Sequence, residues 1–490
     1  MEVADLGNGS INRWQARVAG AMHLEKRYFP VPSPVTGQPV AMVAFCGREA
    51  MLLAAEGAAL AASVWRCAMP EYRAMLLRRW ATLIAQHSGR ISTSITLETG
   101  KPVAESRAEV AEATSFIERC AEFARVAEKS FYSEQNDGRQ LVSTVRGVGT
   151  VFAITNWCQP TFTVARRAAL ALASGCQIII KPSSRAPLTA LMLADLWAEA
   201  GGPMGTVQVL TTDDPVGTLA ACLQSSNVDL VCFTGSLDVG RYLSARCAEA
   251  HKSTVTEMGG LSPMIVFPDA DLKKAADAIV ECIFLRNAGQ DCTSANRLYV
   301  HESVAERLIG MLRARVSALT VGDPRQLDTQ VGPLIDGTAL TMLLEHIDDA
   351  VDAGARVVTG GRPSGGLRVA PTILDFTSIV MDSTLEAPPG PLASVFRFYS
   401  AEQVAAAISR GTRGRVAWIW CADVGHAMAY ADELGFSHVL INESGAVSCE
   451  HSLLSMDARV PGPHVMRHSP YLRAVHRSYP TTRSNEQPGF

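Results

Sequence analysis

Residues 151–183 read VFAITNWCQPTFTVARRAALALASGCQIIIKPS, which is an apolar run, a helix-length segment and a second apolar run. Parallel strands that are covered on both faces need near-continuous apolar residues, so 151–154 and 177–180 are expected to be buried strands. Similar apolar runs follow at 207–210 and 230–233. Strand, helix and strand repeated at this spacing predict right-handed βαβ units in a doubly wound sheet.

A second set of strand-like runs lies at 263–267, 297–300, 356–358 and 438–441. Between them an apolar helix face is expected, because its residues recur at the i, i+3, i+4, i+7 spacing: Leu340, Leu343, Leu344, Ile347 and Val351. At 490 residues the chain is also too long for one core. The predicted fold class is therefore α/β, with two doubly wound domains.

Residues 131–147 differ from both sets. Asn136-Asp137-Gly138 is a strong turn signal between two polar, strand-like runs, which predicts a small β-hairpin. Exposed hairpins commonly pair across subunit interfaces, so an oligomerisation element and a homodimer or homotetramer are expected.

Composition narrows the classes of partner. The net charge is −4 and no basic block is present, so nucleic acid is not expected as a partner. No window approaches the ~18 apolar residues that cross a bilayer, and the first residues lack a signal-peptide pattern, which favours a cytoplasmic protein without membrane contact. The 12 cysteines form no CxxC pair, so no metal site is expected.

Five short motifs point together to one chemistry. They are LETGKP at 97–102, IIIKPS at 178–183, FTGS at 233–236, EMGG at 257–260 and GQDC at 289–292. Their order and spacing resemble the aldehyde dehydrogenase superfamily over roughly residues 30–445, and most closely its succinate-semialdehyde dehydrogenases. The resemblance implies a cofactor-binding domain from 1–130 and 148–257, the oligomerisation hairpin at 131–147, a catalytic domain at 258–445 and a divergent C-terminal loop and oligomerisation tail at 446–490.

The resemblance identifies Cys292 as the nucleophile and Glu257 as the general base. Hydride transfer from an aldehyde requires a tetrahedral adduct first, and a cysteine thiolate has the nucleophilicity to form it. The resulting thioester needs an activated water, and a partly buried glutamate with a raised pKa suits that role.

The cofactor is expected at the turn from the 230–233 strand into a helix, where free N–H groups can face a pyrophosphate. Ser184 stands where the family usually has an acidic residue for the ribose of NAD, and Arg185 follows it. The loss of a carboxylate removes repulsion against a 2′-phosphate, so NADP is favoured over NAD. The residues implied in cofactor binding are Thr155, Trp157, Lys181, Ser183, Ser184, Phe233, Thr234, Gly235, Ser236 and Gly259.

Arg166 and Arg286 look like the two arginines with which succinate-semialdehyde dehydrogenases hold the substrate carboxylate. The planar guanidinium pairs bidentately with an anion, so a small anionic aldehyde is the expected substrate. The alternative is that either arginine lies on a solvated helix face.

Three departures from the family pattern stand out. Cys158 replaces the asparagine that helps to bind the oxyanion, and a thiol is only a weak donor. The nearby Asn156 would have to reach from the opposite side of the strand end to take over. Ala387 replaces the glutamate that holds the nicotinamide ribose, and the family's glycine-rich loop cannot be recognised in 446–470.

These departures leave two alternatives to an NAD(P)-dependent dehydrogenase. One is a degenerate member of the family with weak or no activity that serves as a binding or scaffold protein. The other is cofactor-free hydrolysis of thioesters or esters by the same Cys292 and Glu257.

Overall fold

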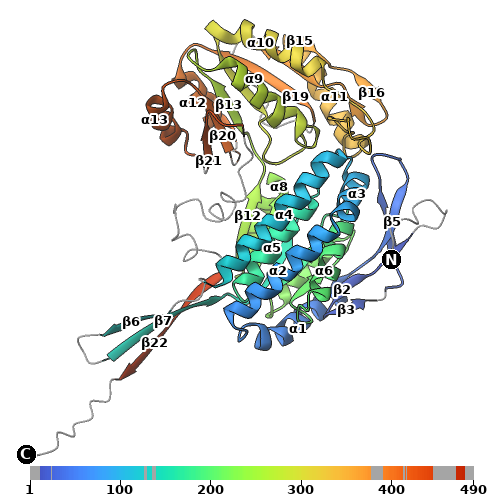
Figure 1. Ribbon diagram of the computed structural model, residues 1–490, viewed down its shortest axis with the longest axis vertical. Helices are drawn as coiled ribbons and strands as arrows, with labels where there is room; N and C mark the ends of the chain where they lie inside the picture. The colour runs from blue at the N-terminus through green and yellow to red at the C-terminus, as the bar shows by residue number, and fades with distance from the viewer. Residues whose placement is uncertain are drawn as a thin grey trace, which may run out of the picture.

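The computed structural model describes residues 12–23, 25–125, 130–134, 139–376, 390–411, 414, 416–436, 438–444 and 471–480. Two seven-stranded sheets, each covered by helices, form the lower and upper parts of the molecule (Figure 1). The predicted fold class, α/β with two doubly wound sheets, is confirmed.

The first sheet has the strand order β12-β11-β8-β9-β10-β2-β3. Its parallel strands are β8 (Thr150–Ile154), β9 (Gln177–Lys181), β10 (Val207–Val209), β11 (Leu230–Gly235) and β12 (Ser253–Met258). Two short antiparallel strands, β2 (Ala16–Val18) and β3 (Ala21–His23), complete one edge. The strands β8 and β11 are neighbours, but the strand that follows β8 lies on one side of this pair and the strand that follows β11 lies on the other. Their carboxyl ends therefore form a topological switch point, where such sheets bind ligands.

Helices cover both faces of this sheet. The helices are α1 (Arg48–Trp65), α2 (Pro70–Gln86), α3 (Ser88–Thr99), α4 (Val103–Ala124), α5 (Pro160–Ala173), α6 (Leu188–Glu199), α7 (Pro215–Gln224) and α8 (Leu237–Glu249). Val151 and Ala153 of β8 belong to the core formed with α2, α4 and α5, whereas Phe152 faces the core formed with α1, α7 and α8. This alternation explains why residues 151–154 of the strand are all apolar.

The second sheet has the order β15-β18-β19-β14-β13-β20-β21. Its strands are β13 (Pro263–Val266), β14 (Arg297–His301), β15 (Arg356–Thr359), β18 (Thr372–Phe376), β19 (Leu392–Phe398), β20 (Val416–Trp420) and β21 (His438–Ile441), and only the edge strand β15 is antiparallel. One face packs on α9 (Leu272–Val280) and α10 (Glu302–Ser317). The other packs on α11 (Gly337–Asp352), α12 (Ala401–Arg410) and α13 (Val424–Leu434).

The predicted apolar face of α11 is only partly correct. Leu343 and Ile347 are buried in the core, but Val351 is 42% exposed. It lies in the last turn of the helix.

A third sheet projects from the lower part of the molecule (Figure 1). Here β6 (Ser130–Glu134) and β7 (Arg139–Gly147) pair as the predicted antiparallel hairpin, whose turn at 136–138 lies outside the described residues. The other edge of β7 pairs along its whole length with β22 (Leu472–Pro480), which the sequence did not predict. Tyr471, just before β22, is fully buried and accepts a hydrogen bond from the backbone N–H of Val148, which anchors this strand to the core.

The smaller elements are β1 (Arg13–Trp14), β4 (Tyr28–Pro32) and β5 (Pro39–Ala44) in one sheet, and β16 (Pro363–Gly365) with β17 (Arg368–Val369) in another.

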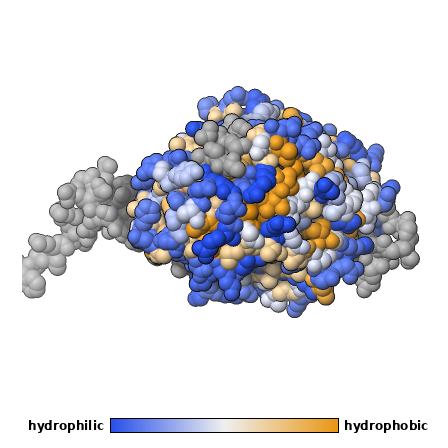
Figure 2. Space-filling model, turned by 90° about the horizontal axis from the view of Figure 1, so that it is seen from above, coloured by the Kyte–Doolittle hydropathy of each residue, from blue (hydrophilic) through white to orange (hydrophobic). Residues whose placement is uncertain are grey.

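Among the described residues, every helix is too short or too polar to cross a bilayer. Viewed from above, hydrophobic residues gather near the middle of the surface and hydrophilic ones border them (Figure 2).

The LETGKP motif has a structural role that begins with Glu98. This fully buried side chain accepts a hydrogen bond from the backbone N–H of Leu188 at 2.8 Å, at the start of α6. The N-cap of α6, Pro187, provides no side-chain cap, so Glu98 takes that function. Burial raises the pKa of Glu98 from 4.5 to about 8, which keeps the carboxyl protonated at neutral pH.

Glu98 should therefore make the stability of the fold fall as the pH rises. Its folded pKa is raised, so between pH 4.5 and about 8 the folded state holds a proton that the unfolded state has lost. The thermal unfolding midpoint of the parent should be lower at pH 9 than at pH 6. The difference should be smaller for Glu98→Gln, because glutamine cannot titrate. Glu118→Gln, on the exposed face of α4, should behave as the parent. Parallel pH profiles for the parent and Glu98→Gln would contradict this assignment.

Candidate active site

A pocket of about 460 Å³ lies at the switch point of the first sheet, where the loop before β14 of the second sheet meets it. This volume is in the range of small-molecule sites. The lining residues come from the ends of β8, β9, β11 and β12, the first turn of α8 and the loop before β14: Thr155, Asn156, Trp157, Cys158, Lys181, Ser183, Ser184, Phe233, Thr234, Gly235, Ser236, Val239, Gly259, Gly260, Gly289, Gln290, Asp291, Cys292, Ser294 and Asn296. Of the predicted site residues, only Glu257, Arg166 and Arg286 are absent from this lining.

The loop that carries Cys292 has an unusual backbone. Asn287, Ala288 and Gly289 all have positive φ, at 46°, 52° and 75°. Such values cost energy for residues other than glycine, so the surroundings must impose them. The carboxylate of Glu105 accepts from the backbone N–H of Asn287 at 2.8 Å, and the Gln290 side chain bonds three backbone groups, the carbonyls of 287 and 333 and the N–H of 335.

A buried ion pair supports the opposite wall. Lys101 donates to Glu109 at 2.5 Å and to the carbonyl of Cys158 at 2.7 Å. The other oxygen of Glu109 accepts from the backbone N–H groups of Thr161 and Phe162, in the first turn of α5. Burial alone would lower the pKa of Lys101, but Glu109 and Glu105 more than offset it and raise that pKa. Lys101 thus stays charged and fixes the turn between β8 and α5.

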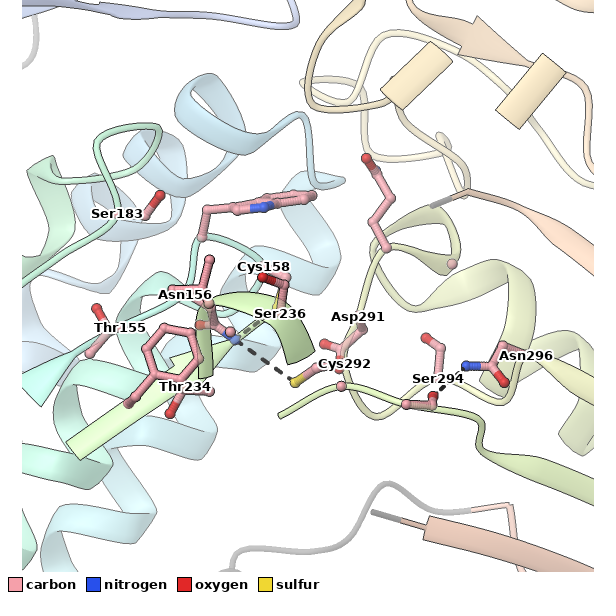
Figure 3. Close-up of a pocket in the computed structure, with 18 of the residues that line it drawn as sticks. Thr155, Asn156, Cys158, Ser183, Thr234, Ser236, Asp291, Cys292, Ser294 and Asn296 are labelled. Atoms are coloured by element: carbon pink, nitrogen blue, oxygen red, sulfur yellow. Dashed lines mark hydrogen bonds between the residues drawn. The ribbon is translucent and has the colours of Figure 1, made fainter. Parts of the chain in front are cut away.

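Cys292 is half-buried and faces the turn between β8 and α5 (Figure 3). The side-chain amide nitrogen of Asn156 lies 3.8 Å from the Cys292 Sγ and 3.0 Å from the Cys158 Sγ. The Cys158 thiol is in hydrogen-bonding contact with Cys292, and this contact, followed by burial, raises the pKa of Cys158 well above its ordinary value. Cys158 therefore remains a neutral thiol beside the predicted nucleophile.

Glu257, the predicted base, is held beneath the pocket by two arginines. Arg166 binds it bidentately, with 2.7 Å between Nη1 and Oε1, and the Nη2 of Arg167 lies 3.0 Å from Oε2. Thr234 donates to the same carboxylate at 3.1 Å. All three charged side chains are buried. In this arrangement the base and one predicted substrate-binding arginine bind each other.

Arg286 is placed differently. It caps the π-helical turn Glu281–Leu285 that precedes the nucleophile loop, and its Nη1 is buried without a hydrogen-bond partner among the described residues. A buried guanidinium N–H without a partner costs free energy unless an anion binds it. Arg166 also has a buried Nε without a partner among the described residues, but both of its Nη atoms bind Glu257, so an anion-binding role is better supported for Arg286.

The other end of the pocket fits a dinucleotide. Burial lowers the pKa of Lys181 to about 8, and its ammonium donates only to the carbonyl of Pro182 among the described residues, at 3.2 Å. An ammonium has three donors, so others remain for a ligand. Helix α8 starts at the pocket without a side-chain cap on its N-terminal N–H groups. A Cβ at Gly235 would lie 2.5 Å from the Phe233 ring, so a larger residue here would force that ring to move.

Ser184 lines this end of the pocket, but Arg185 does not. Arg185 instead forms an ion pair with Asp336, the N-cap of α11, and the two side chains are 43% and 28% exposed. Ala387 and residues 446–470, where the sequence departs from the family pattern, lie outside the described residues.

Two contacts in the site were not anticipated from the sequence. Gln159 donates to Asp291 at 2.7 Å, which links the turn after β8 to the nucleophile loop. Asn296 bonds both the carbonyl of Gly260 and the backbone N–H of Ser262, which fixes the connection from β12 to β13. Neither pair is close in the sequence, so local pattern carried no signal for them.

Comparison with known proteins gives a consistent result. The aldehyde dehydrogenase family profile matches residues 22–454. The NADP-dependent succinate-semialdehyde dehydrogenase of Escherichia coli K12 is 37% identical over 86% of this chain and 87% of its own length. A glutarate-semialdehyde dehydrogenase of Pseudomonas aeruginosa is also 37% identical, with the same coverage of both chains. The crystal structure of succinate-semialdehyde dehydrogenase from Burkholderia pseudomallei superposes with a TM-score of 0.89 at 32% identity, over 97% of this chain and all of that one. Agreement of this extent in sequence and in three dimensions establishes that the chain belongs to the aldehyde dehydrogenase family and is an oxidoreductase of that family.

Proposed function

We propose that this enzyme oxidises a small anionic aldehyde to its carboxylic acid through a covalent adduct on Cys292, with NADP favoured over NAD. One observation carries the proposal: the half-buried Cys292 thiol shares a pocket with a free helix N-terminus and a buried lysine. The two relatives with 37% identity are named for semialdehydes of dicarboxylic acids, which supports an anionic substrate.

In the proposed reaction, the Cys292 thiolate attacks the carbonyl carbon, a C–S bond forms and the oxygen takes the negative charge. A bound nicotinamide supplies the acceptor for the hydride that leaves this carbon. The carbonyl then re-forms as a thioester on Cys292. Water attacks the thioester, the base takes a proton from that water, and the thiolate departs from the acid.

Glu257 is the proposed base, and its ion pairs set a condition on that role. Both of its oxygens accept from buried arginines, so the carboxylate must turn away from Arg166 before it can reach a water at Cys292. Glu257 and Arg166 are therefore proposed to act as a coupled pair.

The non-catalytic alternative loses its support, because membership of a family of dehydrogenases is established. Cofactor-free ester hydrolysis uses the same thiol, and an activated-ester assay run without nicotinamide separates it from oxidation.

Replacing Cys292 by Ser should abolish aldehyde oxidation, with a loss of at least about 10³-fold, as expected for removal of a nucleophile. Folding and cofactor binding should persist, since Cys292 supports no other element. Glu257→Gln should instead give a first turnover and then stall at the thioester. Absorbance of the reduced cofactor under pre-steady-state conditions measures both. A Cys292→Ser variant that retains a sizeable fraction of turnover would show that another residue attacks the aldehyde.

The cofactor preference rests on the absence of a carboxylate among the described lining residues at the Lys181 end. The half-exposed Arg185–Asp336 pair contributes only about 0–1 kcal/mol, so a 2′-phosphate can compete for Arg185. Ser184→Glu should shift the ratio of the affinities for the two cofactors toward NAD by roughly five-fold or more. The new carboxylate and the 2′-phosphate should repel each other by about 1–4 kcal/mol at 4 Å. Fluorescence titration with NADPH and NADH tests this, with the exposed Ser226→Glu as the matched control. Tighter binding of NADH by the parent would refute the preference.

The anionic substrate is best tested at Arg286, because a change at Arg166 also releases Glu257. Arg286→Gln should lower kcat/KM for succinate semialdehyde by about 10–100-fold, corresponding to a charge-assisted hydrogen bond of roughly 1.5–3 kcal/mol. Butanal, uncharged and of the same chain length, should be little affected. Arg313→Gln, on the exposed face of α10, is the control for loss of charge. Equal losses for both aldehydes would mean that Arg286 is structural.

A further inference from the structure

Asn156 lies at the site of the proposed attack, two residues beyond β8. Its side-chain amide nitrogen is 3.8 Å from the Cys292 Sγ, and a dashed line in Figure 3 joins the two residues. Asn156 and Cys292 reach this point from opposite walls of the pocket, one from the first sheet and one from the loop before β14. The contact therefore exists only where the two α/β units meet.

The orientation of this amide is fixed. Thr163, which is 2% exposed in the first turn of α5, donates its hydroxyl hydrogen to the Asn156 Oδ1 at 3.0 Å. The carboxamide oxygen is thus occupied, and the NH₂ group points toward the two sulfurs. A thiolate can only accept hydrogen bonds, which favours the same orientation.

The chemistry of the attack requires a donor at this point. When the Cys292 sulfur bonds to the carbonyl carbon, the negative charge develops on the carbonyl oxygen. This oxygen is then two bonds from the sulfur, one C–S and one C–O. A donor stabilises this oxyanion when it lies about 2.7–3.1 Å from the oxygen, not from the sulfur. An amide that is 3.8 Å from the free Sγ is within reach of that position.

Position 158 is unsuited to the task. Its side chain is a buried thiol with a raised pKa, and a thiol is a weak donor. Its backbone carbonyl is bound to Lys101. The Cys158 Sγ also accepts from the Asn156 amide at 3.0 Å.

We propose that Asn156 is a catalytic residue whose side-chain amide donates to the oxyanion of the tetrahedral adduct on Cys292. This rests on the proposed covalent mechanism. No proton is transferred from the amide: it donates a hydrogen bond as the C–S bond forms, and the bond weakens when the carbonyl re-forms. Thr163 is a positioning residue, because it acts only through the amide that it orients.

Two reactions of the parent enzyme test this assignment: oxidation of succinate semialdehyde with NADP, and acylation of Cys292 by 4-nitrophenyl acetate without cofactor. Both create an oxyanion on a carbon bonded to Sγ. Asn156→Ala should slow each by about 10²–10³-fold, the range for loss of one oxyanion donor, and leave KM unchanged. Asn156→Asp, of the same shape but without the NH₂ donor, should be at least as slow. Thr163→Val should give a smaller loss in kcat.

Matched controls separate the oxyanion role from a structural one. Asn227→Ala removes a carboxamide from the turn before β11, outside the pocket, and should leave both reactions unchanged. Alkylation of Cys292 by iodoacetamide forms no oxyanion, so Asn156→Ala should affect it far less than acylation. Adding Cys158→Asn to Asn156→Ala should restore part of the lost rate, because an amide returns to the same wall.

Asn156→Ala proteins that acylate as fast as the parent would overturn the assignment, as would a ten-fold gain from Cys158→Asn alone. If the parent acylates but oxidises no aldehyde, and the acylation rates follow the expected order, the assignment of Asn156 stands and the proposed oxidation fails. A parent that performs neither reaction would overturn both.

Discussion

The buried ion pair between Lys101 and Glu109 supports the arrangement of the active site. Together with Glu98 and Glu105, it places four ionisable side chains in residues 98–109, and these bond the backbone at three places: Lys101 and Glu109 at the turn between β8 and α5, Glu98 at the start of α6, and Glu105 at the loop before Cys292. The loops after β8 and β9 and the loop before Cys292 are all reached from this one segment. A buried charge is tolerated only when it is paired and hydrogen-bonded, so a change in one partner would disturb loops that are far apart in the sequence. This is the physical reason for the LETGKP motif, whose residues do not line the pocket.

A second buried charge cluster lies beneath the pocket. The single carboxylate of Glu257 pairs with both Arg166 and Arg167, and Tyr471 contacts Arg167 from the C-terminal segment. Burial lowers the pKa of Arg167, but the charge of Glu257 more than offsets it and raises that pKa. Arg167 thus connects Glu257, the proposed base, to the segment that leads into β22.

The substitutions that set this chain apart are connected in space. The asparagine expected at 158 is absent, but an amide from position 156 reaches the same sulfur. Gln159 and Asp291 also bind each other, 132 positions apart in the sequence. Each pair joins the turn after β8 to the loop that carries Cys292. The asparagine missing at 158 is thus accompanied by an amide from position 156 near the same sulfur.

The sequence by itself determined the two α/β units, the strands that form their centres and the identity of the residues that meet at the pocket. Apolar runs and short motifs are local signals, and the chemistry of a cysteine or a strand-to-helix turn does not depend on distant residues. Tertiary structure decided what those residues do to one another. Arg166 could be recognised as a candidate substrate-binding arginine, but its ion pair with Glu257 depends on how α5 lies relative to β12. The pairing of β22 with β7 and the approach of Asn156 to Cys292 join residues more than 100 positions apart. Such contacts are set by the packing of whole elements, which no local pattern encodes.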